Sequence, residues 1–273
     1  MDRRTLMVAG AATLLTAGAW RAADAPKGDP IVVGHSFRLE DGAFPAPTTV
    51  NVWLPSSYGE GDRRYPVLYL LDGGVNEDFH HISGLARISG DYGVTREFIV
   101  VGIESGATRR RDMTFPSNLA DDLKAIPVNG GSGEFRRLIA ERVIPWAEAR
   151  FRTSSERVVM GESLAGLFVL ETLLKQPDLF TGYIAVDPSL WWNGSSLVRA
   201  LDLPGWKLTG RQRRLWLTVS SQGSAAEAQA IADGLKDGVD VTFVPMPEET
   251  HASIYHPAAT RAFRSMFAQP PKG

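Results

Sequence analysis

The sequence predicts an α/β fold in which a mostly parallel sheet is covered by helices on both faces. From residue 65 onward, strand patterns alternate with helix patterns, which is the element order of parallel sheets. Residues 67–71 read Val-Leu-Tyr-Leu-Leu and are apolar throughout, as in a strand buried on both faces. Two strand patterns before residue 65 have no helix between them, so they predict an antiparallel start.

Eight apolar or β-branched runs predict strands, and four amphipathic runs predict helices. In the longest helix pattern Phe135, Leu138, Ile139 and Val143 fall on one stripe. The expected strands are 31–39, 48–54, 67–71, 98–103, 157–160, 182–186, 214–219 and 241–244, and the expected helices are 135–151, 164–176, 225–235 and 257–267. No internal linker is evident, and we expect residues 26–273 to form a single catalytic domain.

The composition excludes several classes of protein. The chain has 273 residues, with 29 Lys and Arg against 31 Asp and Glu, and no Cys. The absence of Cys rules out disulfides, thiolate zinc sites, iron–sulfur clusters and a Cys nucleophile. A net charge of −2 gives no electrostatic footprint for nucleic acid, so no nucleic-acid partner is expected.

The first 25 residues have the features of an export signal. Arg3-Arg4 precede a modest apolar stretch, which ends in the small residues Ala23-Asp24-Ala25. The paired arginines favour the twin-arginine type over a Sec signal, and Pro26 leaves the cleavage position open. The apolar run is too short and too rich in Gly and Thr for a stable membrane span. These features predict an exported, periplasmic protein.

Residues 158–166 predict a nucleophile elbow, a strand–turn–helix in which a serine is pushed above the sheet. Gly161 lies two residues before Ser163 and Ala165 two residues after it, with Gly166 next. The flanking residues must be small because strand and helix pass close to the turn. The alternative is a Ser that only caps the helix. The Leu164 N–H at the start of that helix is the expected first oxyanion donor.

A serine nucleophile needs a base, and His251 is the best candidate. It follows the last expected strand, where the Ser–acid–His order places the histidine. His256 is the competitor, five residues further on and directly before Pro257.

The expected acid is Glu227, the first carboxylate after the strand 214–219. It would orient the imidazole and stabilise its charged form. Asp240 is the second candidate, and a Ser–His dyad without an acid is the third possibility.

Residues at the ends of other strands predict an oxyanion loop and a pocket. Glycines follow the strand 67–71, and the Gly74 N–H is the expected second oxyanion donor. The cluster Arg109 to Arg111 follows the fourth strand, so Arg109 and Arg111 are candidates for binding an anionic substrate. Trp191 and Trp192 follow the sixth strand and are candidates for lining an aromatic pocket. No histidines and carboxylates have the spacing of a metal site, and no cofactor is expected.

These motifs resemble the Putative esterase family of α/β-hydrolases, which includes esterase D and enterobactin-type siderophore esterases. The most specific block runs from Gly161-Glu162-Ser163-Leu164-Ala165-Gly166 to Pro188-Ser189-Leu190-Trp191-Trp192. The resemblance implies an α/β-hydrolase fold without a large lid domain, and hydrolysis of carboxylic esters through a serine. The more distant mycolyltransferases have a Gly-x-x-x-Glu arrangement similar to Gly223…Glu227 and an oxyanion loop similar to Asp72-Gly73-Gly74. Ala165 departs from the usual Gly, and Asp187 stands where these esterases often have Ser.

The expected activity is therefore that of a serine esterase with a Ser163–His251–Glu227 triad and an acyl-enzyme. A small-molecule ester is the expected partner, and a ferric catecholate ester is the sharpest hypothesis because Arg109 and Arg111 would meet its charge. The alternatives are feruloyl or acetyl esters of polysaccharides, acyl transfer to an alcohol acceptor, and an inactive binding protein of hydrolase fold. The sequence does not indicate an oligomeric state.

Overall fold

A computed structural model describes residues 28–40, 47–202 and 213–270. The chain divides into two units, Met1–Val32 and Val33–Gly273. Within the first unit, residues 28–32 are exposed and form neither helix nor strand. The predicted export signal at 1–25 lies outside the described residues. All further elements belong to the second unit.

The second unit is built on one eight-stranded sheet with the order β1-β2-β4-β3-β5-β6-β7-β8. β1 pairs with β2 and β2 with β4 in antiparallel fashion, and every other neighbouring pair is parallel. The predicted fold class is thereby confirmed, including the antiparallel start. The strands are β1 His35–Leu39, β2 Thr48–Trp53, β3 Tyr65–Leu71, β4 Ile99–Ile103, β5 Thr153–Glu162, β6 Gly182–Val186, β7 Arg213–Thr218 and β8 Val239–Phe243.

Helices cover both faces of this sheet, and four of them lie in segments where no helix was predicted: α1, α2, α3 and α7. The predicted helix 135–151 is a continuous run of α4, a π-helical turn at Ile139–Val143 and α5. The helices are α1 Phe79–Asp91, α2 Arg109–Asp112, α3 Ala120–Ala125, α4 Ser132–Leu138, α5 Ile144–Arg150, α6 Leu164–Lys175, α7 Trp192–Arg199, α8 Ala225–Leu235 and α9 Tyr255–Met266.

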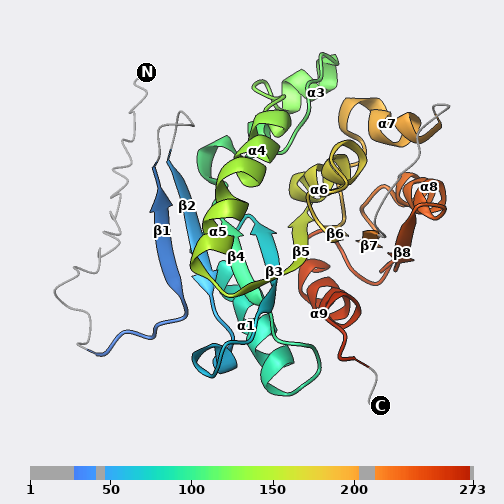
Figure 1. Cartoon of the computed structure of the whole chain (residues 1–273). Helices are drawn as coiled ribbons and strands as arrows, with labels where there is room; N and C mark the ends of the chain where they lie inside the picture. The colour runs from blue at the N-terminus through green and yellow to red at the C-terminus, as the bar shows by residue number, and fades with distance from the viewer. Residues whose placement is uncertain (1–27, 41–46, 203–212, 271–273) are drawn as a thin grey trace, which may run out of the picture. The chain divides into compact units, whose positions relative to one another are not determined.

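Alternation along the strands divides the core into two layers. In β5, Val158 and Met160 belong to the layer under α1 and α9, whereas Val159 belongs to the layer under α4, α5 and α6. Figure 1 shows α1 and α9 on one side of the sheet and α4 to α6 on the other. Six neighbouring strands run parallel to one another: β4, β3, β5, β6, β7 and β8. Their carboxyl ends therefore share one edge of the sheet, where the loops that carry catalytic residues are expected.

A buried ion pair joins α6 to α4 inside one of these layers. The Glu171 carboxylate is fully buried; its Oε2 lies 3.2 Å from Arg136 Nη1 and its Oε1 lies 2.7 Å from Lys175 Nζ. The stability of a buried charge depends on its oppositely charged partners, because removing one of them leaves the other charge uncompensated in a medium of low polarity.

We expect Glu171→Gln to lower the free energy of unfolding by about 3 kcal/mol, because Arg136 would keep its charge without a carboxylate. Urea unfolding followed by circular dichroism measures this change. Glu134→Gln, at an exposed position of α4, is the matched control and should leave the midpoint unchanged. Equal midpoints for the two variants would contradict the prediction.

Among the described residues, no helix combines the length and the apolar character that a membrane crossing requires.

Candidate active site

Ser163 occupies a sharp turn between β5 and α6, as the sequence predicts. Its backbone has φ 61° and ψ −118°, a conformation that a non-glycine residue adopts only under strain. A Cβ at Gly161 would lie 2.5 Å from the Cβ of Ala165, so position 161 must be glycine. Because Gly161 leaves that space open, the elbow accommodates Ala165 in place of the usual Gly.

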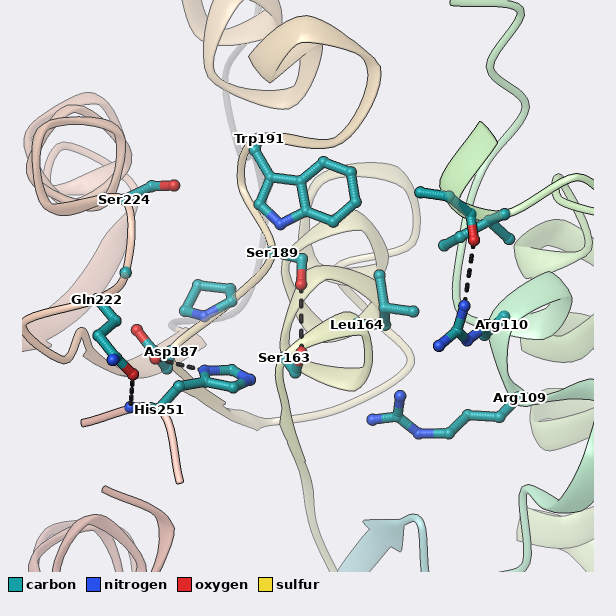
Figure 2. Close-up of a pocket in the computed structure, with 14 residues that line it drawn as sticks. Arg109, Arg110, Ser163, Leu164, Asp187, Ser189, Trp191, Gln222, Ser224 and His251 are labelled. Atoms are coloured by element: carbon teal, nitrogen blue, oxygen red, sulfur yellow. Dashed lines mark hydrogen bonds and ion pairs between the residues drawn. The ribbon is translucent and has the colours of Figure 1, made fainter. Parts of the chain in front are cut away.

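The imidazole of His251 lies between Ser163 and a carboxylate, and that carboxylate is Asp187 (Figure 2). His251 Nδ1 is 2.6 Å from Asp187 Oδ2. The imidazole is half exposed, whereas the Asp187 side chain is buried. Ser163 Oγ lies 3.3 Å from Ser189 Oγ and makes no hydrogen bond to His251 in this structure. The Ser163 hydroxyl and the His251 imidazole must therefore come into hydrogen-bond contact before the imidazole can accept the hydroxyl proton.

Asp187 is fixed by the loop that follows β7. Its Oδ1 accepts a hydrogen bond from the Ser220 N–H at 2.9 Å, and its Oδ2 accepts one from Ser220 Oγ at 2.7 Å. The same loop also contacts the segment of His251, since the His251 N–H donates a hydrogen bond to Gln222 Oε1 at 3.0 Å. One loop thus orients both the carboxylate and the imidazole.

The structure contradicts the expectation that the Glu227 carboxylate orients the His251 imidazole. Glu227 lies in the first turn of α8, where its Oε1 accepts a hydrogen bond from Ser195 Oγ at 3.4 Å. The second candidate, Asp240, is exposed in β8 and lines a separate cavity with Arg96 and Arg214. The reason is topological: the carboxylate that contacts His251 follows β6, whereas Glu227 follows β7. Asp187 is the first carboxylate after β6 and lies between Ser163 and His251 in the chain, a signal that was available in the sequence.

The two expected oxyanion donors have different surroundings. Leu164 is the first residue of α6 and lines the cavity at Ser163, and its N–H makes no hydrogen bond to the described residues. The Gly74 N–H, in contrast, donates to Glu77 Oε2 at 2.7 Å, and Gly74 does not line that cavity. The Glu77 carboxylate also accepts hydrogen bonds from the N–H groups of Ser105 and Gly106. Gly74 is therefore not available as an oxyanion donor, and Leu164 remains.

A cavity of about 450 Å³ opens beside Ser163, and two of the three clustered arginines line it. Arg109 lines it, but its guanidinium makes two hydrogen bonds of 2.7 Å to the Asp72 carboxylate. Although burial opposes it, the hydrogen bonds and charge of Asp72 raise the pKa of Arg109. Arg110 is exposed and donates to the backbone carbonyl of Ala125. Arg109 is thus neutralised by Asp72, whereas Arg110 contributes an uncompensated charge among the described contacts.

The expectation for Arg111 is wrong, because its side chain turns away from Ser163. It pairs with Asp112 at 2.7 Å and lines a different cavity together with Glu104 and Glu134. Successive residues of a helical turn point about 100° apart, so three consecutive arginines cannot all face one site.

The tandem tryptophans have separate roles. Trp191 is 46% exposed and lines the cavity at Ser163. Figure 2 shows its indole above Ser189. Trp192 is fully buried and its Nε1 donates to the carbonyl of Phe115 at 2.8 Å, so the expectation that it lines the pocket is wrong. Consecutive residues point in different directions, and the left-handed backbone of residues 193–195 kinks the chain directly after the two tryptophans.

Two carboxyl groups near the elbow hold their protons more strongly than usual. Burial is the main cause for Glu162, whose pKa is raised to about 7. Burial also raises the pKa of Asp78 to about 6, assisted by the charges of Asp72 and Glu77. Among all the residues that the structure describes, no group of three or more His, Asp and Glu side chains is arranged to hold a metal ion.

The sheet order, the strained elbow at the end of β5 and the histidine after the last strand define an α/β-hydrolase fold. A crystal structure of an IroE-like serine hydrolase from Shewanella oneidensis superposes with a TM-score of 0.72 at 27% identity, covering 86% of this chain and 80% of that chain. The BES protein from Bacillus cereus superposes with a TM-score of 0.74 at 23% identity, covering 90% and 100%.

Residues 42–243 match the family model described as Putative esterase, and the chain belongs to this family. The ferri-bacillibactin esterase BesA of Bacillus subtilis is 37% identical over 153 residues, which are 50% of this chain and 52% of that protein. The siderophore triacetylfusarinine C esterase of Aspergillus fumigatus is 29% identical over 183 residues, 62% of this chain and 60% of that protein. These matches therefore span less than two thirds of the relatives' lengths.

Proposed function

We propose that this protein is a serine carboxylic-ester hydrolase whose nucleophile, base and acid are Ser163, His251 and Asp187. The observation that carries the proposal is the placement of the His251 imidazole between Ser163 and the buried Asp187 at the mouth of a cavity. Family membership and the names of the related proteins support the same reaction class. In keeping with residues 1–25, we further propose that the protein acts after export to the periplasm.

The proposed reaction proceeds through an acyl-enzyme. His251 Nε2 accepts the proton of Ser163 Oγ while Oγ attacks the ester carbonyl carbon. The Leu164 N–H donates to the oxyanion, and Asp187 stabilises the imidazolium that forms. Collapse of the tetrahedral intermediate releases the alcohol, which takes its proton from His251. A water molecule, deprotonated by His251, then attacks the acyl carbon. Collapse of this second intermediate releases the carboxylic acid, and His251 returns the proton to Ser163 Oγ. These residues perform the reaction without a metal or cofactor.

We propose an aromatic, anionic ester as the substrate, with ferric catecholate esters as the leading candidates. Trp191 supplies an exposed aromatic surface beside Ser163, and Arg110 supplies a positive charge at the same cavity. A catecholate complex presents both an aromatic ring and negative charge, so these two side chains are complementary to it. BesA and the A. fumigatus protein are named for siderophore esters, which supports this choice.

The test combines covalent labelling with a panel of esters. A fluorophosphonate should modify Ser163, as mapped by peptide mass spectrometry, and Ser163→Ala should remain unlabelled. The panel comprises p-nitrophenyl acyl esters, methyl ferulate and a ferric catecholate ester, each with and without an added alcohol. Hydrolysis of the catecholate ester supports the proposal, and transfer to the alcohol indicates an acyltransferase. Absence of both labelling and turnover in the folded protein would contradict the proposal.

We expect Arg110→Ala to raise the KM for the ferric catecholate ester about five- to tenfold with little change in kcat, because one exposed charge contact is lost. KM for neutral p-nitrophenyl acetate should not change. Arg111→Ala is the matched control, since Arg111 pairs with Asp112 outside this cavity. Steady-state kinetics on both substrates provide the measurement. A larger effect of Arg111→Ala than of Arg110→Ala would overturn this assignment.

A further inference from the structure

A buried carboxylate in α3 has no part in the proposed reaction. Of the six described residues of this helix, Asp122 alone is buried and the others are exposed. Asp122 Oδ2 accepts hydrogen bonds from Ser117 Oγ at 2.5 Å and from the Asn193 N–H at 2.9 Å. Both donors are neutral groups, which compensate the burial of a carboxylate only in part. The presence of Asp122 in an otherwise exposed helix therefore needs an explanation.

On one side, Asp122 is connected to a wall of the cavity at Ser163. The Asp122 backbone carbonyl accepts a hydrogen bond from the Ile126 N–H at 2.7 Å, and both Ala125 and Ile126 line the cavity. Arg110 Nη1 donates to the Ala125 carbonyl at 3.1 Å, a contact drawn as a dashed line in Figure 2. The position of α3 therefore sets the position of the Arg110 guanidinium.

On its other side, Asp122 contacts the turn that follows Trp191. Residues 193–195 all have a left-handed backbone, with φ 50°, 59° and 59°. This conformation is costly for Asn193 and Ser195, and it persists only where the surrounding structure enforces it. The Asn193 N–H donates to Asp122, and the Ser195 N–H donates back to the Trp191 carbonyl at 3.3 Å. These contacts fix the chain directly behind the indole that lines the cavity.

We infer that Asp122 is a positioning residue which, through α3 and residues 193–195, holds Arg110 and Trp191 in place for an aromatic, anionic ester. This inference rests on the proposed function, in which these two side chains bind the substrate. Arg110 and Trp191 belong to different segments of the chain, and Asp122 joins those segments by hydrogen bonds. Its hydrogen-bond partners do not include Ser163, His251 or Asp187, so its loss should affect substrate binding rather than the chemical step.

The test compares Asp122→Ala and Ser117→Ala with the wild type. Asp121→Asn is the matched control, because Asp121 is the exposed neighbour of Asp122 in the same helix. Ser117→Ala removes only one hydrogen bond of the carboxylate and decides the question if Asp122→Ala does not fold. The first measurement is the ¹⁹F NMR resonance of Trp191 in protein labelled with 5-fluorotryptophan, assigned with Trp191→Phe. It requires no turnover. We expect this resonance to move in Asp122→Ala, to move less in Ser117→Ala and to stay in place in Asp121→Asn.

The second measurement is steady-state kinetics on the ferric catecholate ester and on p-nitrophenyl acetate. For the catecholate ester, Asp122→Ala should raise KM about tenfold and leave kcat within about twofold, because two binding groups are displaced and no reacting group is. KM for p-nitrophenyl acetate should stay within about twofold. In protein that already carries Arg110→Ala and Trp191→Ala, the added Asp122→Ala should raise KM less than about twofold, since no binding group remains to be positioned.

The outcomes separate this inference from the proposed function. An unmoved Trp191 resonance in both Asp122→Ala and Ser117→Ala overturns the inference. An equal loss of kcat on both esters with unchanged KM overturns it as well, because that pattern describes a structural role. So does a tenfold effect that persists without Arg110 and Trp191, or a wild type that hydrolyses p-nitrophenyl acetate but not the catecholate ester. A wild type that hydrolyses no ester contradicts the proposed function, and the ¹⁹F resonance then still decides whether Asp122 positions Trp191.

Discussion

Asp187→Asn is expected to lower kcat for ester hydrolysis by about 10⁴-fold, the size of the loss seen when the acid of a Ser–His–Asp triad becomes an amide. The carboxylate accepts hydrogen bonds from His251 Nδ1, the Ser220 N–H and Ser220 Oγ at once. An asparagine has one acceptor oxygen in place of two. Its NH₂ group would face a donor, and the imidazole would adopt the wrong tautomer or turn away.

Glu227→Gln is the comparison that decides between the two candidate acids. Glu227 contacts Ser195 and has no contact with His251, so we expect kcat within about twofold of the wild type for a substitution outside the reacting groups. Both variants are assayed with p-nitrophenyl esters after circular dichroism confirms the fold. A large loss in Glu227→Gln with a small one in Asp187→Asn would show that the sequence-based choice of Glu227 was right and that the contact with Asp187 is incidental.

The positions of Ser163 and His251 could be predicted because local chemistry specifies them. The elbow requires small residues at Gly161 and Ala165, and a histidine after the last strand needs only the strand order. The acid depends on which strand end lies next to the histidine in three dimensions. β6 and β7 are neighbours in the sheet, so carboxylates after either strand are within range, and the assignment depends on side-chain direction. The spacing of residues in the sequence does not specify the direction of these side chains.

The oxyanion loop illustrates a second kind of error. The glycines after β3 were expected to bring a backbone N–H to the substrate, yet the Gly74 N–H donates to Glu77, only three residues further along the chain. A carboxylate such as that of Glu77, which folds back onto its own turn, produces no periodic pattern in the sequence. The same holds for Arg111, whose neighbour Asp112 removes it from the cavity.

The sheet was predicted more completely than the helices, for a physical reason. Strands buried on both faces, such as β3, are continuous apolar runs that few other structures tolerate. The helix α1, in contrast, buries Phe79, Ile82 and Ala86 but is interrupted by Gly84 and other small residues of weak helical preference. Packing against α9, which no local pattern reveals, stabilises α1 in the folded protein.

Gly223→Ala is expected to lower kcat by about 10²-fold, because it displaces the carboxylate that orients His251. A Cβ at Gly223 would lie 2.0 Å from Asp187 Oδ1 and 2.5 Å from Val219 Cγ2, distances that require one of these groups to move. Val219 is buried in the core, and Asp187 is held by Ser220 and His251. The carboxylate can move only by losing hydrogen bonds, so the effect should fall on kcat rather than on KM.

A double-mutant cycle shows whether this loss acts through Asp187. If Gly223→Ala works by displacing the carboxylate, it should cost little in an Asp187→Asn background, and the two effects should be strongly non-additive. Gly84→Ala is the matched control, since a Cβ there has nothing within 4 Å and the residue is exposed in α1. That control should retain full activity and gain about 0.5 to 1 kcal/mol of stability from its better helical preference. Additive losses in the double variant would show that Gly223 affects the reaction by a route independent of Asp187.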